Sequence, residues 1–289
     1  MKDFFQVVRY QQAWHELMNV RPPQVLQTLG LYEAGGRIAA ADVGSREDLP
    51  SFDRSTVDGY ALRAGDIYGC SESSPGLLEN VGEVKMGQET SLTLHKGQCC
   101  WIPTGGMLPA GADAVIMMEY TEKLDEKTVL THRPAAPFEN VMQAGEDVRA
   151  GQIIISAGQV IRPADIGLMA SSGVKSLQVF KPYRVGIIST GDEIVPPDQE
   201  LAPGEIRDVN SYALYAAVDE CGAIPTAYPL VKDQFAAIQQ TVAAGLAAND
   251  ILLLSGGSSV GVLDVTLDVL MSFADARMLF HGLAVKPGK

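Results

Sequence analysis

Polar residues follow an apolar run of strand length in the C-terminal third of the chain. The segment Ser255-Gly256-Gly257-Ser258-Ser259-Val260-Gly261 directly follows the run 251–254, and we expect a helix to start near Asp264. Glycine lets backbone N–H groups approach a phosphate closely, and a helix start favours an anion. The segment is interpreted as a phosphate site, or as a tight connection that needs glycine only for its conformation. Its spacing matches neither G-x-G-x-x-G nor the P-loop.

A second polar segment, Ser189-Thr190-Gly191-Asp192-Glu193, ends another apolar run. Because the carboxyl ends of parallel strands meet at one edge of a sheet, we expect it to lie beside the first segment. The carboxylates of Asp192 and Glu193 could hold a magnesium ion that bridges to phosphate oxygens. The alternative is a solvated acidic turn without a ligand.

Three further polar turns lie earlier in the chain. They contain Asp58 (in 52–61), Thr104 (in 103–107) and Asp147 (in 145–147). Such turns can present a hydroxyl or a carboxylate to a ligand, but an ordinary turn has the same composition. No histidine stands near another histidine or a cysteine at metal-ligand spacing, and no cysteine pair forms C-x-x-C, so a zinc site is not expected.

The elements that must position the two C-terminal segments alternate between strand and helix. Apolar residues recur at helical spacing in 214–221 and 235–246, with Gly222 as a stop for the first helix and Asp233 as a cap for the second. The runs 184–189, 227–231 and 251–254 are expected to be strands. This alternation predicts a doubly wound α/β domain.

The rest of the chain has a different character. Residues 1–45 are expected to be mostly helical, with an apolar stripe through Val7, Trp14, Leu17 and Met18. Residues 46–141 contain short apolar runs separated by Gly and Pro, which indicates a small β-domain. Residues 142–178 mix a strand at 153–155 with a helix from Arg162. We therefore predict a multi-domain α/β plus β protein, with 46–141 and 179–289 as two of its domains.

Composition excludes several classes of protein. The chain has 289 residues, 35 acidic and 22 basic, and a net charge of -13, so nucleic acid is not an expected partner. No apolar stretch reaches the roughly 20 residues that span a bilayer, and the N-terminus lacks the pattern of a signal peptide. The four cysteines are expected to be reduced thiols of a cytoplasmic protein with no membrane partner.

Six motifs in the same order resemble the molybdopterin molybdenumtransferase family, which includes bacterial MoeA proteins and the E domain of gephyrin. The matching segments are Leu49 to Ala61, Pro103 to Val115, Gly145-Glu146-Asp147, Ser189 to Glu193, Ser255 to Gly261 with Asp264, and Lys286-Pro287-Gly288-Lys289. One such motif is weak evidence, whereas six in order along nearly the whole chain are specific.

The resemblance implies a domain plan. It predicts an elongated linker domain made of 1–45 and 142–178, interrupted by the inserted β-domain 46–141. A molybdopterin-binding α/β domain, 179–289, follows and is expected to be incomplete at its C-terminus, since the family continues into a β-barrel. The family forms homodimers, with the active cleft between the α/β domain of one subunit and the β insert of the other.

The resemblance also implies the reaction. Adenylylated molybdopterin and molybdate are the substrates, molybdenum cofactor and AMP are the products, and Mg²⁺ assists. The protein that adenylylates molybdopterin is a further expected partner. The alternative is a non-catalytic molybdopterin-binding or scaffold module. The resemblance assigns catalytic roles to Asp58, Thr104, Asp147, Glu193, Asp264, Lys286 and Lys289. It assigns ligand binding to Thr190, Gly191, Asp192, Ser255, Gly256, Gly257, Ser258, Ser259 and Gly261, and metal binding to Asp192 and Glu193.

Three positions depart from the family pattern. Many members carry an acidic residue directly after the position of Gly261, and an aromatic residue and a lysine after that of Asp264. This chain has Val262, Val265 and Leu267 there. No role for the family's side chains at these three positions is therefore carried over.

Overall fold

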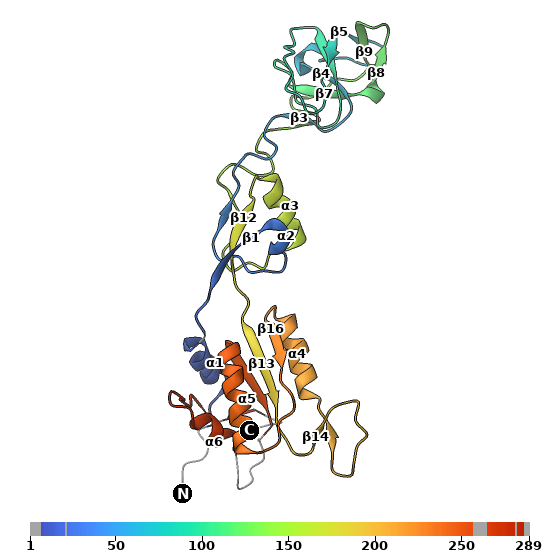
Figure 1. The fold of residues 1–289 in the computed structure, drawn as a ribbon. Helices are drawn as coiled ribbons and strands as arrows, with labels where there is room; N and C mark the ends of the chain where they lie inside the picture. The colour runs from blue at the N-terminus through green and yellow to red at the C-terminus, as the bar shows by residue number, and fades with distance from the viewer. Residues whose placement is uncertain (1–6, 21, 257–264, 281, 286–289) are drawn as a thin grey trace. The chain divides into compact units, whose positions relative to one another are not determined.

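The structure is a computed structural model that describes residues 7–20, 22–256, 265–280 and 282–285. It divides into two compact units (Figure 1). We call residues 1–27 and 180–289 the α/β unit, and residues 28–179 the β-rich unit. Residues 1–27, which the sequence suggested were part of a linker domain with 28–45, are thus grouped with the C-terminal part of the chain. The three-domain division stays a prediction.

A six-stranded sheet forms one part of the β-rich unit, in the order β7-β4-β6-β5-β9-β8. The pair β5 and β6 is parallel, and the other neighbours are antiparallel. The strands are β4 (Gly59–Leu62), β5 (Gly76–Glu83), β6 (Gln98–Ile102), β7 (Ala114–Met117), β8 (Thr121–Lys123) and β9 (Thr128–Thr131). Two 3-10 turns, η1 (Ala64–Asp66) and η2 (Met118–Tyr120), follow β4 and β7.

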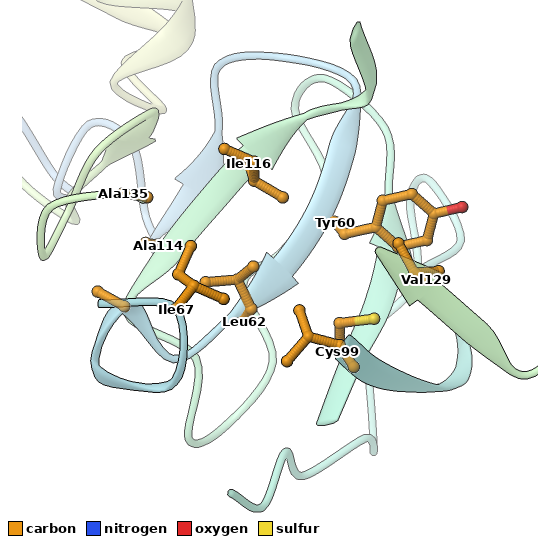
Figure 2. Packing of buried hydrophobic residues seen from close by; sticks show 10 residues of the cluster. Tyr60, Leu62, Ile67, Cys99, Ala114, Ile116, Val129 and Ala135 are labelled. Carbon is orange, nitrogen blue, oxygen red and sulfur yellow. The ribbon is translucent and has the colours of Figure 1, made fainter. Parts of the chain in front are cut away.

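The sheet has a hydrophobic core on each face. Leu62 and Cys99 belong to one cluster, drawn in Figure 2, whereas Ala61 and Cys100 belong to the other. Neighbouring residues separate in this way because side chains alternate across a strand. Burial raises the pKa of both the Cys99 and the Cys100 thiols to about 12. These two thiols therefore act as inert packing groups.

The remainder of the β-rich unit has its own core, centred on Met169 and Val179. It is built from α2 (Leu31–Ala34), α3 (Pro163–Ser171) and the strand pairs β1–β12 and β2–β11. The bounds of these strands are Leu26–Gly30 (β1), Val43–Gly44 (β2), Ile153–Ile155 (β11) and Ser176–Phe180 (β12), and the short pair β3 (Arg54–Ser55) and β10 (Val141–Met142) leads into the six-stranded sheet. The predicted strand 153–155 and helix from Arg162 are confirmed.

The start of α3 carries an ion pair with a measurable pH dependence. Asp165 accepts two hydrogen bonds of 3.0 Å from the Arg162 guanidinium and one of 2.8 Å from the Arg162 N–H. These bonds lower the pKa of Asp165 from 3.8 to about 2, the side-chain bonds most. Because the pKa is lowered in the folded state, the stabilisation is present above pH 3.8 and is lost as the pH falls toward 2.

We expect a carboxyl NMR titration to give Asp165 a midpoint of about 2. In Arg162→Ala the midpoint should rise toward 3.8, because both guanidinium bonds are lost. Glu126→Gln, in an exposed turn of the same unit, is the control and should leave the midpoint unchanged. An Asp165 midpoint that is the same with and without the arginine would contradict this origin of the shift.

The α/β unit contains a three-stranded parallel sheet in the order β16-β13-β17. The strands are β13 (Arg184–Ser189), β16 (Ile224–Ala227) and β17 (Ile251–Ser255). The helix α4 (Asn210–Glu220) packs on one face, whereas α5 (Phe235–Ala248) and α6 (Val265–Met271) pack on the other (Figure 1). Helices on both faces confirm the predicted doubly wound α/β arrangement. A short parallel pair, β14 (Ile194–Val195) and β15 (Ile206–Arg207), lies in the connection from β13 to α4.

Two local predictions in the α/β unit were wrong. The strand predicted at 227–231 is β16 at Ile224–Ala227, where Pro225 is tolerated because the strand is at the sheet edge. Asp233 makes no cap, since α5 starts after Gln234 without a side-chain cap bond. The first helix, α1 (Tyr10–Asn19), carries the predicted apolar stripe, which is exposed; among the residues of α1 only Ala13 is buried.

The N-terminal segment reaches the end of the described chain. Val8 forms a parallel bridge with Leu283, and its N–H donates to the Gly282 oxygen at 3.2 Å. This pairing explains why the first residues group with the α/β unit. None of the helices in the described ranges is long and apolar enough to span a bilayer.

Candidate functional site

Two neighbouring parallel strands end side by side at the carboxyl edge of the α/β sheet. Ser189 and Ser255 are register partners, and the Thr190 N–H donates to the Ser255 oxygen at 2.8 Å. The Gly191 N–H donates to the Val231 oxygen at 3.1 Å, so the turn after β13 is fixed on both sides. The expected juxtaposition of the two polar segments is confirmed at these residues. We call Thr190 to Glu193 together with Ser255 and Gly256 the strand-end site.

Glycine is needed at position 256 for two reasons. Its φ is +123°, which L side chains rarely adopt, and a Cβ there would overlap the backbone oxygen of Thr190. The close approach also covers the Thr190 side chain, which is 2% exposed. Among the described residues, Thr190 Oγ1 is the one fully enclosed side-chain oxygen or nitrogen without a hydrogen-bond partner. A buried hydroxyl without a partner costs about 1–3 kcal/mol, so this edge carries unmet hydrogen-bonding capacity.

The acidic part of the strand-end site is exposed and has a cation beside it. Lys232 Nζ donates to the Asp192 backbone oxygen at 2.7 Å, and the Asp233 N–H donates to Asp192 Oδ1 at 3.3 Å. The side chain of Glu193 is exposed as well. The sequence analysis did not identify Lys232 and predicted only a helix cap for Asp233. Both residues are about forty positions from Asp192 in the chain, so no local pattern connects them.

The start of α4 also reaches this edge. Asn210 Nδ2 donates to Ser255 Oγ at 2.5 Å, and the Ser211 and Ser189 hydroxyls share a hydrogen bond of 2.8 Å. The Ser211 N–H donates to Asp208 Oδ1 at 3.0 Å, so Asp208, directly before the N-cap residue Val209, satisfies one N–H group of the first turn. The helix start adds its partial positive charge to the strand-end site. Sequence reasoning missed these residues, although the polar run 207–211 directly before an apolar helix was a usable signal.

Asp58 and Thr104 meet in the β-rich unit. Asp58 Oδ1 accepts hydrogen bonds from the Thr104 N–H at 2.7 Å and the Thr104 hydroxyl at 2.9 Å. The backbone bond, and after it the side-chain bond, lower the pKa of Asp58. The carboxylate is therefore an exposed, ionised group held in one orientation at neutral pH. The third predicted residue, Asp147, is exposed and bonds to Leu49 through its N–H, with no side-chain bond to the Asp58–Thr104 pair.

Several predicted site residues lie outside the described residues. They are Gly257, Ser258, Ser259, Gly261, Asp264, Lys286 and Lys289. Of the positions that depart from the family pattern, Val262 lies outside the described residues, whereas Val265 packs against the core between the sheet and α5.

The carboxylates of the strand-end site suit a metal ion that a bound ligand also coordinates. Within the described part of the chain, no three His, Cys, Asp or Glu side chains gather as a metal cluster. Asp192 and Glu193 supply two exposed carboxylates beside the strand-end site. Magnesium is commonly bound by one or two carboxylates together with substrate phosphates and water, rather than by a protein cage. The residues therefore fit a magnesium ion that arrives with a phosphate ligand.

Known protein families match nearly the whole chain. Residues 8–173 match the MoeA N-terminal region (domain I and II), and residues 186–289 match the family described as "Probable molybdopterin binding domain". A molybdopterin molybdenumtransferase from Nostoc is 36% identical over 266 residues, which are 92% of this chain and 61% of that protein. Molybdopterin molybdenumtransferase 2 from Mycobacterium tuberculosis is 35% identical, over 98% of this chain and 70% of that protein.

Solved structures agree with the family matches. A molybdopterin biosynthesis MoeA protein from Pyrococcus horikoshii OT3 superposes with a TM-score of 0.83 at 31% identity. The superposition covers 98% of this chain and 70% of that protein. The chain thus spans less than two thirds of the Nostoc relative and somewhat more of the other two.

Proposed function

The chain belongs to the MoeA family of molybdopterin molybdenumtransferases, and on this premise we propose that it inserts molybdenum into adenylylated molybdopterin. The products are molybdenum cofactor and AMP, and molybdate is the second substrate. The observation that carries the proposal is the strand-end site. There the backbone of Gly256 lies close to Thr190, and Asn210 at the start of α4 reaches the same edge of the sheet. Such an edge suits the phosphate groups of the ligand.

Each residue group has a part in this proposal. The strand-end site and the start of α4 hold the phosphate groups, and Lys232 offsets their charge from beside Asp192. Asp192 and Glu193 hold the magnesium ion, which neutralises phosphate charge when bound. The Asp58–Thr104 pair presents a fixed carboxylate to the reacting ligand. Asp147, Asp264, Lys286, Lys289 and the rest of the 257–261 segment keep the ligand-contacting roles that the family resemblance gives them.

The test is release of AMP from adenylylated molybdopterin in the presence of molybdate and Mg²⁺. We expect release to need all three components, and to stop when a chelator removes Mg²⁺, because the two carboxylates and the phosphates would then repel one another. Adding Mg²⁺ back should restore release. Ligand binding without AMP release under any of these conditions would favour the alternative, a molybdopterin-binding module without turnover.

We also propose that the protein works in the cytoplasm as a homodimer in which the Asp58–Thr104 pair of one copy acts at the strand-end site of the other. A mixture of Asp58→Ala and Gly256→Ala copies tests this. At subsaturating substrate each variant alone should keep at most about 1% of the wild-type rate. Mixed dimers contain one intact site and should recover about a quarter of the wild-type rate on statistical pairing. No recovery on mixing, with exchange of copies verified, would contradict the arrangement. The adenylylating protein remains a proposed partner that supplies the substrate.

A further inference from the structure

A cavity of about 450 Å³ lies beside α4 in the α/β unit, and we call it the α4 pocket. Tyr212 and Tyr215 on the helix line it, together with Pro196, Pro229 and Leu230. The two tyrosine side chains are 59% and 45% exposed. Its volume falls within the range of small-molecule sites, and its walls are largely aromatic and apolar. Such walls suit a flat ring system.

One buried charge lines this apolar pocket. Asp208 is 8% exposed, and its Oδ1 accepts the Ser211 N–H at 3.0 Å. No described donor reaches its Oδ2, and this oxygen is not among the fully enclosed atoms that lack a partner. Because Asp208 lines the pocket, Oδ2 is placed to accept a donor that a ligand brings. A charge-assisted hydrogen bond in largely apolar surroundings is strong, so a ligand that brings N–H groups to Oδ2 gains binding energy.

The α4 pocket and the strand-end site share the start of one helix. Ser211 lines the pocket while its hydroxyl bonds to Ser189 at the end of β13. Asn210, two residues after Asp208, donates to Ser255 at the end of β17. A ligand with a ring system on one side and phosphate on the other can therefore occupy both.

We propose that the α4 pocket binds the pterin ring of the substrate, with the N–H donors of the ring facing Asp208. The inference rests on the proposed function and adds to it the place of the ring. A pterin presents two adjacent donors, the ring N–H and the 2-amino group, which match a carboxylate. The adenine of the same substrate presents an amino donor beside a ring nitrogen that only accepts, and this nitrogen would face a carboxylate oxygen unfavourably.

The experiment is a titration of the chain with 6-hydroxymethylpterin, followed by pterin fluorescence, and separately with AMP and with pyrophosphate. Asp208→Asn keeps an oxygen to accept the Ser211 N–H but turns an N–H₂ group toward the ligand. We expect it to weaken pterin binding by at least about tenfold, the effect of losing one charge-assisted hydrogen bond. Pyrophosphate binding should stay within about twofold, because the strand-end site is intact.

Two further variants complete the test. Tyr212→Ala, which removes an exposed wall of the pocket, should also weaken pterin binding and spare pyrophosphate. Asp219→Asn, an exposed carboxylate on the same helix, is the control and should bind pterin like the wild type. Pterin binding that is absent, or unchanged in both Asp208→Asn and Tyr212→Ala, would overturn the proposal. AMP binding that Asp208→Asn weakens as much would overturn it in favour of adenine.

The result separates this inference from the proposed function. Pterin binding that depends on Asp208, with no AMP release in the turnover assay, would leave the pocket assignment standing and refute molybdenum insertion. AMP release by a chain whose pterin affinity does not depend on Asp208 would leave molybdenum insertion standing and refute the pocket assignment.

Discussion

Gly256→Ala is expected to reduce the affinity for adenylylated molybdopterin by at least about 100-fold, a loss of roughly 2.7 kcal/mol. The added methyl group would overlap the backbone oxygen of Thr190 and approach its hydroxyl to 2.5 Å. Backbone cannot swing aside as a flexible side chain can, so β13 and β17 must separate at their carboxyl ends. Isothermal titration with the ligand measures the loss.

A matched control separates this overlap from simple backbone strain. Gly204 also has a positive φ, of +94°, but a Cβ there would meet nothing within 4 Å. Both alanine variants carry the cost of a positive φ that L side chains rarely adopt. Gly204→Ala should nevertheless bind the ligand like the wild type. Equal affinities in the two variants would mean that the close approach at Gly256 has no part in binding.

Asp58→Ala should lower the rate of AMP release by at least about 100-fold, within the range found for single groups that position or polarise a reacting ligand. Its carboxylate is ionised at neutral pH, since the Thr104 N–H and hydroxyl lower its pKa. The steady-state rate with saturating substrates is the measurement. Ligand affinity should change much less than the rate, because the phosphates are held in the α/β unit.

Asp125 provides the control within the same unit. It too is exposed, and it accepts a backbone bond from Lys127 at 2.7 Å and a hydroxyl bond from Thr128 at 3.1 Å, which lower its pKa. The two aspartates thus accept the same kinds of bond, but Asp125 takes them from its own turn, whereas Asp58 takes them from Thr104. Asp125→Ala should keep the wild-type rate. If both variants slowed the reaction equally, the Asp58–Thr104 pair would be an ordinary turn, the alternative that its sequence left open.

The elements around the strand-end site could be predicted where local patterns decide the structure. The strands β13 and β17 are apolar on both faces, and α4 and α5 carry apolar residues at helical spacing. The edge strand β16 was placed three residues too late. Its apolar content is low, so Tyr228 to Val231 gave the stronger local pattern, although Pro225 in β16 still pairs at the sheet edge.

The contacts of the site depend on tertiary structure that local patterns do not encode. Asn210 and Ser255 are separated by 45 residues and Asp192 and Lys232 by 40, yet each pair is joined by a hydrogen bond. The turn composition around Asp58 and Thr104 allowed a site but did not reveal the two bonds that orient the carboxylate. The apolar stripe on α1 is exposed, because amphipathic spacing predicts an apolar face but does not say which surface, if any, packs on it.

The most direct test of the central claim is an amide NMR titration of the labelled chain with adenylylated molybdopterin. We predict that the amide signals of Thr190, Gly191 and Gly256 shift in proportion to bound ligand, because these residues belong to the strand-end site. A different cavity, of about 490 Å³ beside Tyr60 and Trp101, lies in the β-rich unit. Shifts confined to that cavity, with Thr190, Gly191 and Gly256 unchanged at saturation, would contradict the claim that the ligand binds at the ends of β13 and β17.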